Sequence, residues 1–354
     1  MAAAQPAGLE EPGLPAVSIR GFLLRRLLVA GPVALGILFL TFMLIRIGDQ
    51  DPVAMLAGPM ADAPMLARIR AELMLDQPVL TQFWAYLGRL VQGDLGRSWQ
   101  GNAPVTHEII AHLPATLELV TLSVGLGTLI GVPIGLYAAE RPNGMFDQLS
   151  RFGSLFGFSL PTYWLGLMSI FVFFYLLDWA PAPMGRVSMM VEAPPTITGS
   201  VLLDSILTGN WAAARSAVSQ LILPVGCFTI IATAPIIKHT RAIAIEVMGS
   251  DYIRYARACG FPRRVVRRIA LRAALVPVIT FVGSEFTSLL AAASLIEFIF
   301  AWGGLGHWGL NAILLGDFAA VQGYVLTLAV ASVIIFVLVD LAVLLLEPRA
   351  QARA

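Results

Sequence analysis

The sequence predicts an all-α, polytopic membrane protein. Of its 354 residues, 58% are hydrophobic and only 13% are charged, a balance that is typical of membrane proteins rather than soluble domains. Six separate stretches are apolar for long enough to cross a bilayer core, which takes about 20 residues of helix. The basic residues also gather in alternate segments between these stretches, as the positive-inside rule requires. These three observations predict six transmembrane helices.

The six predicted spans form one transmembrane domain over residues 23–346. In chain order they are Leu23–Ile45, Ala115–Ala138, Gly153–Leu177, Leu221–Ile237, Ala273–Phe300 and Val321–Leu346. The first span is too long for a removable signal peptide and lacks a small-residue cleavage site. The fourth span is the shortest and contains Pro224 and Pro235, so its ends are the least sharply defined.

The orientation follows from the lysines and arginines. If both termini are cytoplasmic, the cytoplasmic segments hold 16 of the 23 basic residues, and the outer segments hold seven arginines against eleven acidic residues. The opposite orientation would invert this bias. We therefore expect a cytoplasmic N-terminal tail at residues 1–22 and a cytoplasmic C-terminal tail at residues 347–354.

This orientation predicts two large external loops, at residues 48–114 and 178–220. In two segments of the first loop, residues 65–74 and 80–92, the apolar residues lie three or four positions apart. That spacing is typical of short amphipathic helices. We expect both loops to be folded rather than extended linkers.

The cytoplasmic segment at residues 238–272 is unusual, because it holds nine basic residues and only two acidic ones. Before Gly260, helical spacing places Tyr252, Tyr255, Ala256 and Cys259 on one face. Gly260 can end that helix because glycine tolerates positive φ, and Pro262 suits the first turn of the next. Both flanks enter the bilayer within a few residues, which excludes a DNA-binding helix-turn-helix and favours a docking element for a cytoplasmic partner.

No catalytic or metal-binding constellation is predicted. A P-loop needs a glycine-rich loop that ends in Gly-Lys-Ser/Thr, whereas the only lysine, Lys238, follows Pro-Ile-Ile. The histidines of residues 107–112 are five positions apart, so a helix cannot present both to one zinc ion, and we expect them to be solvated. Cys227 and Cys259 show neither disulfide nor metal spacing.

Three carboxylates within the spans are candidates for the translocation path, because a charged group at a helix centre costs roughly 2.5–3.5 kcal/mol. They are Glu285, Glu297 and Asp340. Glu297 lies near the outer face, where it could instead cap structure. Glu285 is the deepest, and two interpretations stay open. It is either a protonated or hydrogen-bonded helix-packing residue, or a pore carboxylate that favours cationic groups.

Small residues recur every four positions in the second span, at Gly127, Gly131 and Gly135. Such a stripe allows two membrane helices to approach closely. We therefore predict that these glycines serve helix packing.

Several motifs resemble those of one family. The segment from Glu246 to Gly260, followed by Ala274-Leu-Val-Pro277, resembles the EAA motif of permease subunits of ATP-binding-cassette (ABC) importers. Further signatures resemble the branch that imports dipeptides, oligopeptides, glutathione and nickel. They are Leu75–Pro78, Gly93–Ser98, Leu113–Thr116, Ser159–Pro161, Glu297–Gly306 and Glu347–Arg349. The chain departs from the family pattern at Met74, where glycine is expected, and at Gly303, where proline is usual.

The resemblance implies an ABC importer permease fold in the inner membrane, with a coupling helix that docks into an ATPase subunit. The implied docking residues are Glu246, Asp251, Tyr252, Arg254, Tyr255, Ala256, Arg257, Ala258 and Gly260. The implied partners are a second homologous permease, two cytoplasmic ATPase subunits and a periplasmic or lipoprotein substrate-binding protein. The chain itself would bind no cofactor, and its partners would use ATP.

The resemblance leaves the cargo open among dipeptides, oligopeptides, glutathione, nickel complexes, opines and sugars. An alternative class is an ion-coupled secondary transporter, with Glu285 or Asp340 as proton carrier. The predicted docking helix and the lack of an inverted repeat count against it.

Overall fold

The computed structural model describes residues 31–43, 62–72, 74–99 and 103–346, together with Leu28 and Val53. Over these residues the chain is helical, without any strand beyond an isolated bridge between Arg97 and Pro104. The predicted all-α class is therefore confirmed. The two predicted tails, residues 1–22 and 347–354, and the ends of the first predicted span lie outside the described residues.

The described helices follow the apolar and amphipathic patterns of the sequence. After the apolar helix Gly31–Met43 they are α3 (Ala63–Glu72), α4 (Val79–Val91), α5 (Val105–Glu140), α6 (Met145–Ser159), α7 (Thr162–Ser169), the π-helical segment η1 (Ile170–Leu176), α8 (Val201–Leu207), α9 (Trp211–Gly249), α10 (Asp251–Ala258), α11 (Arg263–Ile299), α12 (Leu305–Leu314) and α13 (Phe318–Leu346). The two amphipathic segments expected in the first loop correspond to α3 and α4.

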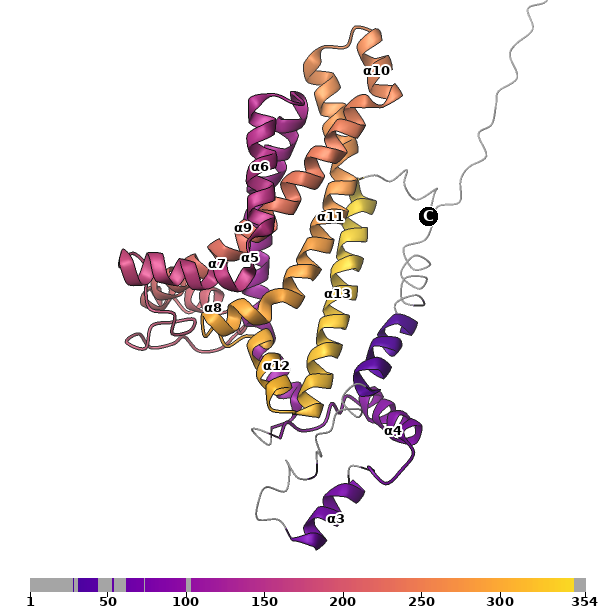
Figure 1. Ribbon diagram of the computed structural model, residues 1–354, viewed down its shortest axis with the longest axis vertical. Coiled ribbons are helices and arrows are strands. Elements are labelled where there is room, and N and C mark those ends of the chain that lie inside the picture. The colour runs from indigo at the N-terminus through magenta and orange to yellow at the C-terminus, as the bar shows by residue number, and fades with distance from the viewer. Residues whose placement is uncertain are drawn as a thin grey trace, which may run out of the picture.

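Long helices run along the main axis of the molecule (Figure 1). Within the described part of the chain, α5, α9 and α13 are each long and apolar enough to cross a membrane, and the bent pair formed by α6 with α7 and η1 is a fourth candidate. The predicted fifth span, Ala273–Phe300, corresponds to the second part of α11 and its C-cap residue. The core forms where α5, α9 and α11 meet, around Leu119, Phe228 and Ile296, which are fully buried.

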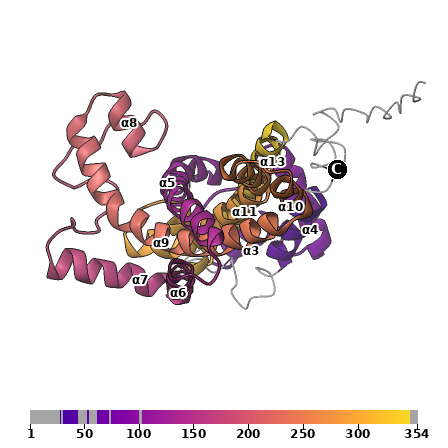
Figure 2. The same cartoon turned by 90° about the horizontal axis from the view of Figure 1, so that it is seen from above.

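The third predicted span is not one straight helix. It bends by 93° between Met145–Ser159 and Thr162–Leu176, so α7 projects sideways from the bundle (Figures 1 and 2). Leu160 is extended, with φ −77° and ψ 124°. The following Pro161 lacks an N–H and disfavours a helical conformation in the residue before it. The apolar composition of Gly153–Leu177 gives no sign of this break.

The fourth predicted span is longer than its apolar core suggests. Helix α9 begins at Trp211, where the Asn210 side chain caps it by accepting a hydrogen bond from the Ala213 N–H at 3.0 Å. It then continues through both Pro224 and Pro235 to Gly249. Neither proline ends the helix, because α9 packs against α5, α6 and α11 along much of its length.

A buried aspartate, Asp317, fixes the loops at the end of the molecule where α12 lies. The Asp317 carboxylate accepts hydrogen bonds from the Ser98 hydroxyl and the Trp99 N–H, both at 2.7 Å. These contacts hold the segment before α5 against the start of α13.

An aromatic contact joins the helix Gly31–Met43 to α4. The rings of Phe42 and Phe83 pack edge to face, with their centroids 5.3 Å apart.

The two departures from the family pattern have a visible backbone consequence. Met74 has φ 55° and Gly303 has φ 69°. The first is a left-handed conformation that glycine adopts without strain, so Met74 carries a local cost of about 1–2 kcal/mol. Proline cannot adopt the positive φ of Gly303, because its ring fixes φ near −65°.

Candidate functional site

The basic segment between α9 and α11 folds as a helical hairpin at one end of the molecule (Figure 1). We call residues 246–272 the α10 hairpin. Gly260 has φ +76°, and the N–H groups of Gly260 and Phe261 donate to the carbonyls of Arg257 and Ala256 at 3.0 and 3.2 Å. This is the hydrogen-bonded glycine stop that the sequence predicted. Pro262 then caps α11.

The α10 helix has an inner and an outer face. Ile253 is fully buried and Ala256 is 6% exposed, and both pack against Val266 and Ala270 of α11. Tyr252 and Tyr255 are 48% and 72% exposed. The hairpin therefore presents two aromatic rings to a partner while small and branched residues hold it together.

This arrangement corrects one prediction. Ala256 was expected among the docking residues on the helical face of Tyr252, Tyr255 and Cys259, but it is 6% exposed and packs with Ile253 against α11. The four-residue pattern placed these residues together, but it could not show which edge of the helix would meet α11. That pattern also missed Ile253, although it is the one large aliphatic residue within Asp251–Ala258.

The other predicted docking residues line the outer side of the hairpin. Glu246, Asp251, Arg254, Arg257, Ala258 and Gly260 are all exposed. Arg254 and Asp251 approach each other at 3.8 Å, but an exposed pair of this kind contributes less than about 1 kcal/mol. Their charges are thus available to a binding partner.

An ion pair joins the base of the α10 hairpin to the bundle. The Arg267 guanidinium donates to the Glu140 carboxylate at 2.7 Å, which links the start of α11 to the end of α5. Arg267 is one of the basic residues of the 238–272 segment, and this contact gives it a structural role. A force applied to α10 would therefore reach both α11 and α5.

Glu297 anchors the opposite end of α11. Its side chain is fully buried, and it accepts hydrogen bonds from the Thr116 hydroxyl at 2.5 Å and the His307 N–H at 2.8 Å. A Cβ on Gly304 would lie 2.5 Å from this carboxylate, which explains the glycine there. Of the two roles that the sequence allows for Glu297, these contacts favour a structural cap joining α5, α11 and α12 over a position in the translocation path.

The other two path candidates occupy separate helices. Glu285 is partly exposed near the middle of α11, and no described group forms a hydrogen bond or ion pair with its carboxylate. Asp340 is partly buried on α13. The structure brings neither residue into a cluster with Glu297.

The glycine stripe of α5 faces α9. A Cβ on Gly127 would lie 2.9 Å from the Cβ of Ala232, and one on Gly131 would lie 2.8 Å from Cγ2 of Ile236. At Gly135, a Cβ would lie 2.8 Å from the Ile237 carbonyl oxygen. The missing side chains allow these two helices to approach closely.

The ion pair between Asp147 and Arg241 was not predicted. Asp147 is 1% exposed at the start of α6. Its carboxylate accepts hydrogen bonds from Nε and Nη2 of Arg241, the second at 2.7 Å. It also accepts one from the Asn143 N–H at 2.8 Å. This bidentate contact joins α6 to α9 at the end of the bundle where the α10 hairpin lies. Sequence spacing gave no signal for it, because the partners lie 94 positions apart.

The described residues contain no group of three or more His, Cys, Asp or Glu side chains that could hold a metal ion. His112 is not simply solvated as expected, because its Nδ1 lies 2.7 Å from the Gly303 carbonyl oxygen. It therefore ties α5 to the segment before α12. Like Glu297 and Asp147, His112 holds separate elements of the bundle together.

An all-α bundle of long apolar helices with an exposed, basic helical hairpin at one end has the architecture of a polytopic membrane protein. Comparison with known proteins identifies its family. The chain belongs to the family described as binding-protein-dependent transport system inner membrane component, whose model matches residues 131–352, and the N-terminal model of the same family matches residues 19–120.

Relatives resemble the chain over nearly its whole length. The dipeptide transport system permease protein DppB of Escherichia coli (strain K12) is 38% identical over 333 residues, which cover 93% of this chain and 98% of the relative. The di/tripeptide transport system permease protein DppB of Pseudomonas aeruginosa (strain UCBPP-PA14) is 38% identical over 330 residues, with the same coverage. The probable D,D-dipeptide transport system permease protein DdpB of E. coli (strain K12) is 37% identical over 318 residues, or 90% and 93% of the two chains.

These matches confirm the family expected from the sequence motifs. The chain is the permease subunit of an ABC importer, a multi-pass inner-membrane protein and not an enzyme, since ATP hydrolysis belongs to separate subunits in this family. The secondary-transporter alternative receives no support from them.

Proposed function

We propose that this permease forms half of the translocation pathway of an importer for dipeptides and closely related short peptides. The observation that carries the proposal is full-length similarity to permeases whose names specify dipeptide or di/tripeptide transport. Glutathione, nickel complexes, opines and sugars are cargoes that the sequence motifs alone leave open. The names of these relatives favour peptides among them.

The proposed complex contains a second homologous permease, two cytoplasmic ATPase subunits and an external substrate-binding protein. Six spans would place both termini on the same side of the membrane, and the excess of basic residues in the segments on that side makes it the cytoplasmic one. The external loops at residues 48–114 and 178–220 would then receive the binding protein. Buried aspartates in the second loop and beside the first give these surfaces a defined shape.

The proposed coupling begins at the α10 hairpin. ATPase closure would press on the exposed Tyr252 and Tyr255 rings, while the buried Ile253 and Ala256 keep α10 fixed to α11. Helix α11 then continues without interruption for 37 residues, about 55 Å at 1.5 Å per residue. At its other end, Glu297 is fixed to Thr116 of α5, so motion at one end would be transmitted to the other.

The test replaces both exposed tyrosines with aspartate, Tyr252→Asp and Tyr255→Asp, in the complete transporter. We expect the ATPase subunits to be lost during affinity purification and ATP-driven dipeptide uptake into proteoliposomes to fall at least tenfold. Removing two large aromatic side chains from a protein interface typically costs more than about 2 kcal/mol. The matched control is Tyr252→Phe with Tyr255→Phe, which keeps both rings and should retain the ATPase subunits.

Two outcomes would contradict the proposal. Full recovery of the ATPase subunits with the doubly charged variant would exclude α10 as the docking element. Concentrative uptake by the purified chain alone, driven by a proton or sodium gradient, would instead establish secondary transport.

A further inference from the structure

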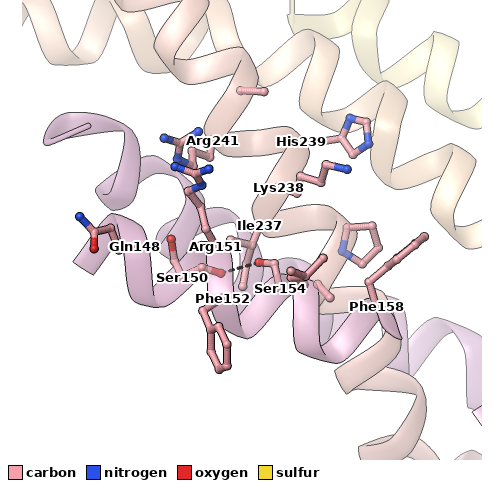
Figure 3. A pocket seen from close by; sticks show the side chains of 14 residues that line it. Gln148, Ser150, Arg151, Phe152, Ser154, Phe158, Ile237, Lys238, His239 and Arg241 are labelled. Carbon is pink, nitrogen blue, oxygen red and sulfur yellow. Dashed lines mark hydrogen bonds between the residues drawn. The ribbon is translucent and has the colours of Figure 1, made fainter. Parts of the chain in front are cut away.

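A groove of about 820 Å³ runs between α6 and α9, near the end of the bundle that carries the α10 hairpin. Figure 3 shows its lining, with basic side chains from both helices at one side and Phe152 and Phe158 along α6. Neither the α10 hairpin nor the path candidates Glu285 and Asp340 contribute to it. The groove is therefore separate from the docking hairpin and from these two carboxylates.

The groove carries uncompensated positive charge. Arg241 is neutralised by its bidentate contact with Asp147. Arg151 and Lys238 are exposed. Neither forms an ion pair with a carboxylate of the described residues, and Asp147, whose charge also acts on Arg151, is already paired with Arg241. Two cations thus remain available to an anionic ligand, and one of them is the only lysine of the chain.

Apart from Gln148, His239 and two serines, the rest of the lining is apolar, and its α6 side is open. Phe152, Leu155 and Phe158 of α6 are 71%, 65% and 75% exposed. Ser150 and Ser154 donate their hydroxyl hydrogens to backbone carbonyls of α6, at 2.9 and 2.7 Å. Ligand recognition would therefore depend on charge and apolar contact rather than on donation from these hydroxyls.

Charge and apolar surface are arranged along the expected membrane normal. Arg151 lies two residues before the third predicted span, and Lys238 lies one residue after the fourth. Both therefore fall at the same expected boundary, the cytoplasmic one. Phe158 lies seven residues further along α6, about 10 Å toward the bilayer interior.

We propose that this groove binds an anionic phospholipid of the cytoplasmic leaflet. The phosphate lies between Arg151 and Lys238, and an acyl chain follows Phe152, Leu155 and Phe158. Basic pockets between transmembrane helices on the cytoplasmic side have the chemistry that anionic headgroups require. A protein partner fits less well, because the two free cations would need buried carboxylates opposite them.

The test measures lipid binding to the complete, delipidated transporter by native mass spectrometry during titration with phosphatidylglycerol. The variant Arg151→Gln with Lys238→Gln should weaken binding roughly 10- to 30-fold, the effect of removing two cations near a membrane surface. Phosphatidylcholine should bind the unaltered transporter much more weakly. Inorganic phosphate alone should not compete, because it lacks the acyl chain.

Two matched variants separate this site from general surface charge and from misfolding. Arg263→Gln with Arg264→Gln removes the same charge from the exposed first turn of α11 and should change binding less than about twofold. Arg151→Lys with Lys238→Arg keeps the charge and should retain binding. The proposal would be overturned if both variants that lack two positive charges lost lipid binding to the same extent. It would also be overturned if free phosphate displaced the bound phosphatidylglycerol. Efficient cross-linking of Phe152→Cys to the partner permease would also overturn it, since protein would then cover the groove.

Discussion

At the residue scale, Asp204 shows how a buried charge organises an external loop. Its carboxylate is 1% exposed. It accepts hydrogen bonds from the N–H groups of Ile197, Thr198 and Gly199 at 3.1, 2.7 and 3.1 Å, and from the Thr198 hydroxyl at 2.7 Å. Burial alone would raise the pKa of Asp204, but these hydrogen bonds outweigh it and hold the pKa below its usual value of 3.8.

The lowered pKa predicts an acid-dependent loop. The stabilisation from the Asp204 carboxylate is fully present above about pH 3.8 and is lost as the pH falls through the lower pKa of the folded state. At neutral pH, Asp204→Asn should destabilise the loop by about 1–3 kcal/mol, because the amide cannot accept all four hydrogen bonds. Hydrogen exchange of the amides at residues 197–199 measures this effect.

The matched control is Glu192→Gln, which removes the same charge from an exposed position of the same loop. Its exchange rates should be unchanged. If both variants exchange at the same rate as the original protein, the hydrogen bonds of Asp204 do not hold the loop.

At the element scale, the close contact between α5 and α9 depends on missing side chains. Gly135→Ala would place a Cβ 2.8 Å from the Ile237 carbonyl oxygen and 3.1 Å from the Arg241 backbone nitrogen. Backbone atoms inside a helix cannot yield easily, so we expect a loss of about 1–3 kcal/mol, the usual cost of overpacking. Thermal unfolding of the purified transporter should show a lower midpoint for this variant.

Gly125→Ala is the control on the same helix, because no atom lies within 4 Å of its added Cβ. Alanine also has a higher helix propensity than glycine, by about 1 kcal/mol, so this variant should unfold at an equal or higher temperature. Equal destabilisation by both variants would show that glycine flexibility matters, rather than contact with α9.

Local chemistry explains which elements the sequence could predict. The stop at Gly260 and the restart after Pro262 depend on the backbone preferences of those two residues, and the structure contains both. The break at Leu160 and Pro161 also has a local cause in the proline, but the 93° angle between the two halves does not follow from composition. Likewise, the roles of Asp147 and Glu297 follow from partners 94 and 181 positions away, and no local pattern identifies such pairs.

At the scale of the whole molecule, α11 connects the proposed docking hairpin to the opposite end of the bundle. Arg267 contacts Glu140 near its beginning, and Glu297 contacts Thr116 near its end, so α11 is fixed to α5 at both ends. Between these anchors, Glu285 has no hydrogen bond or ion pair with any described group. Ionisable residues within membrane spans commonly mark substrate or ion paths. Of the two interpretations of Glu285 we therefore propose the second, a carboxylate that faces the translocation path.

This interpretation predicts a change in cargo preference without loss of assembly. Glu285→Gln in the complete transporter should lower ATP-driven uptake of a lysine-containing dipeptide roughly fivefold relative to a neutral dipeptide, since one screened charge contact contributes about 1 kcal/mol. The rate of ATP hydrolysis and the recovery of the ATPase subunits should stay unchanged, because Glu285 lies far along α11 from the α10 hairpin. An equal effect on both dipeptides would assign the residue to helix packing. A change confined to the cationic dipeptide would instead place the carboxylate on the path that the cargo follows.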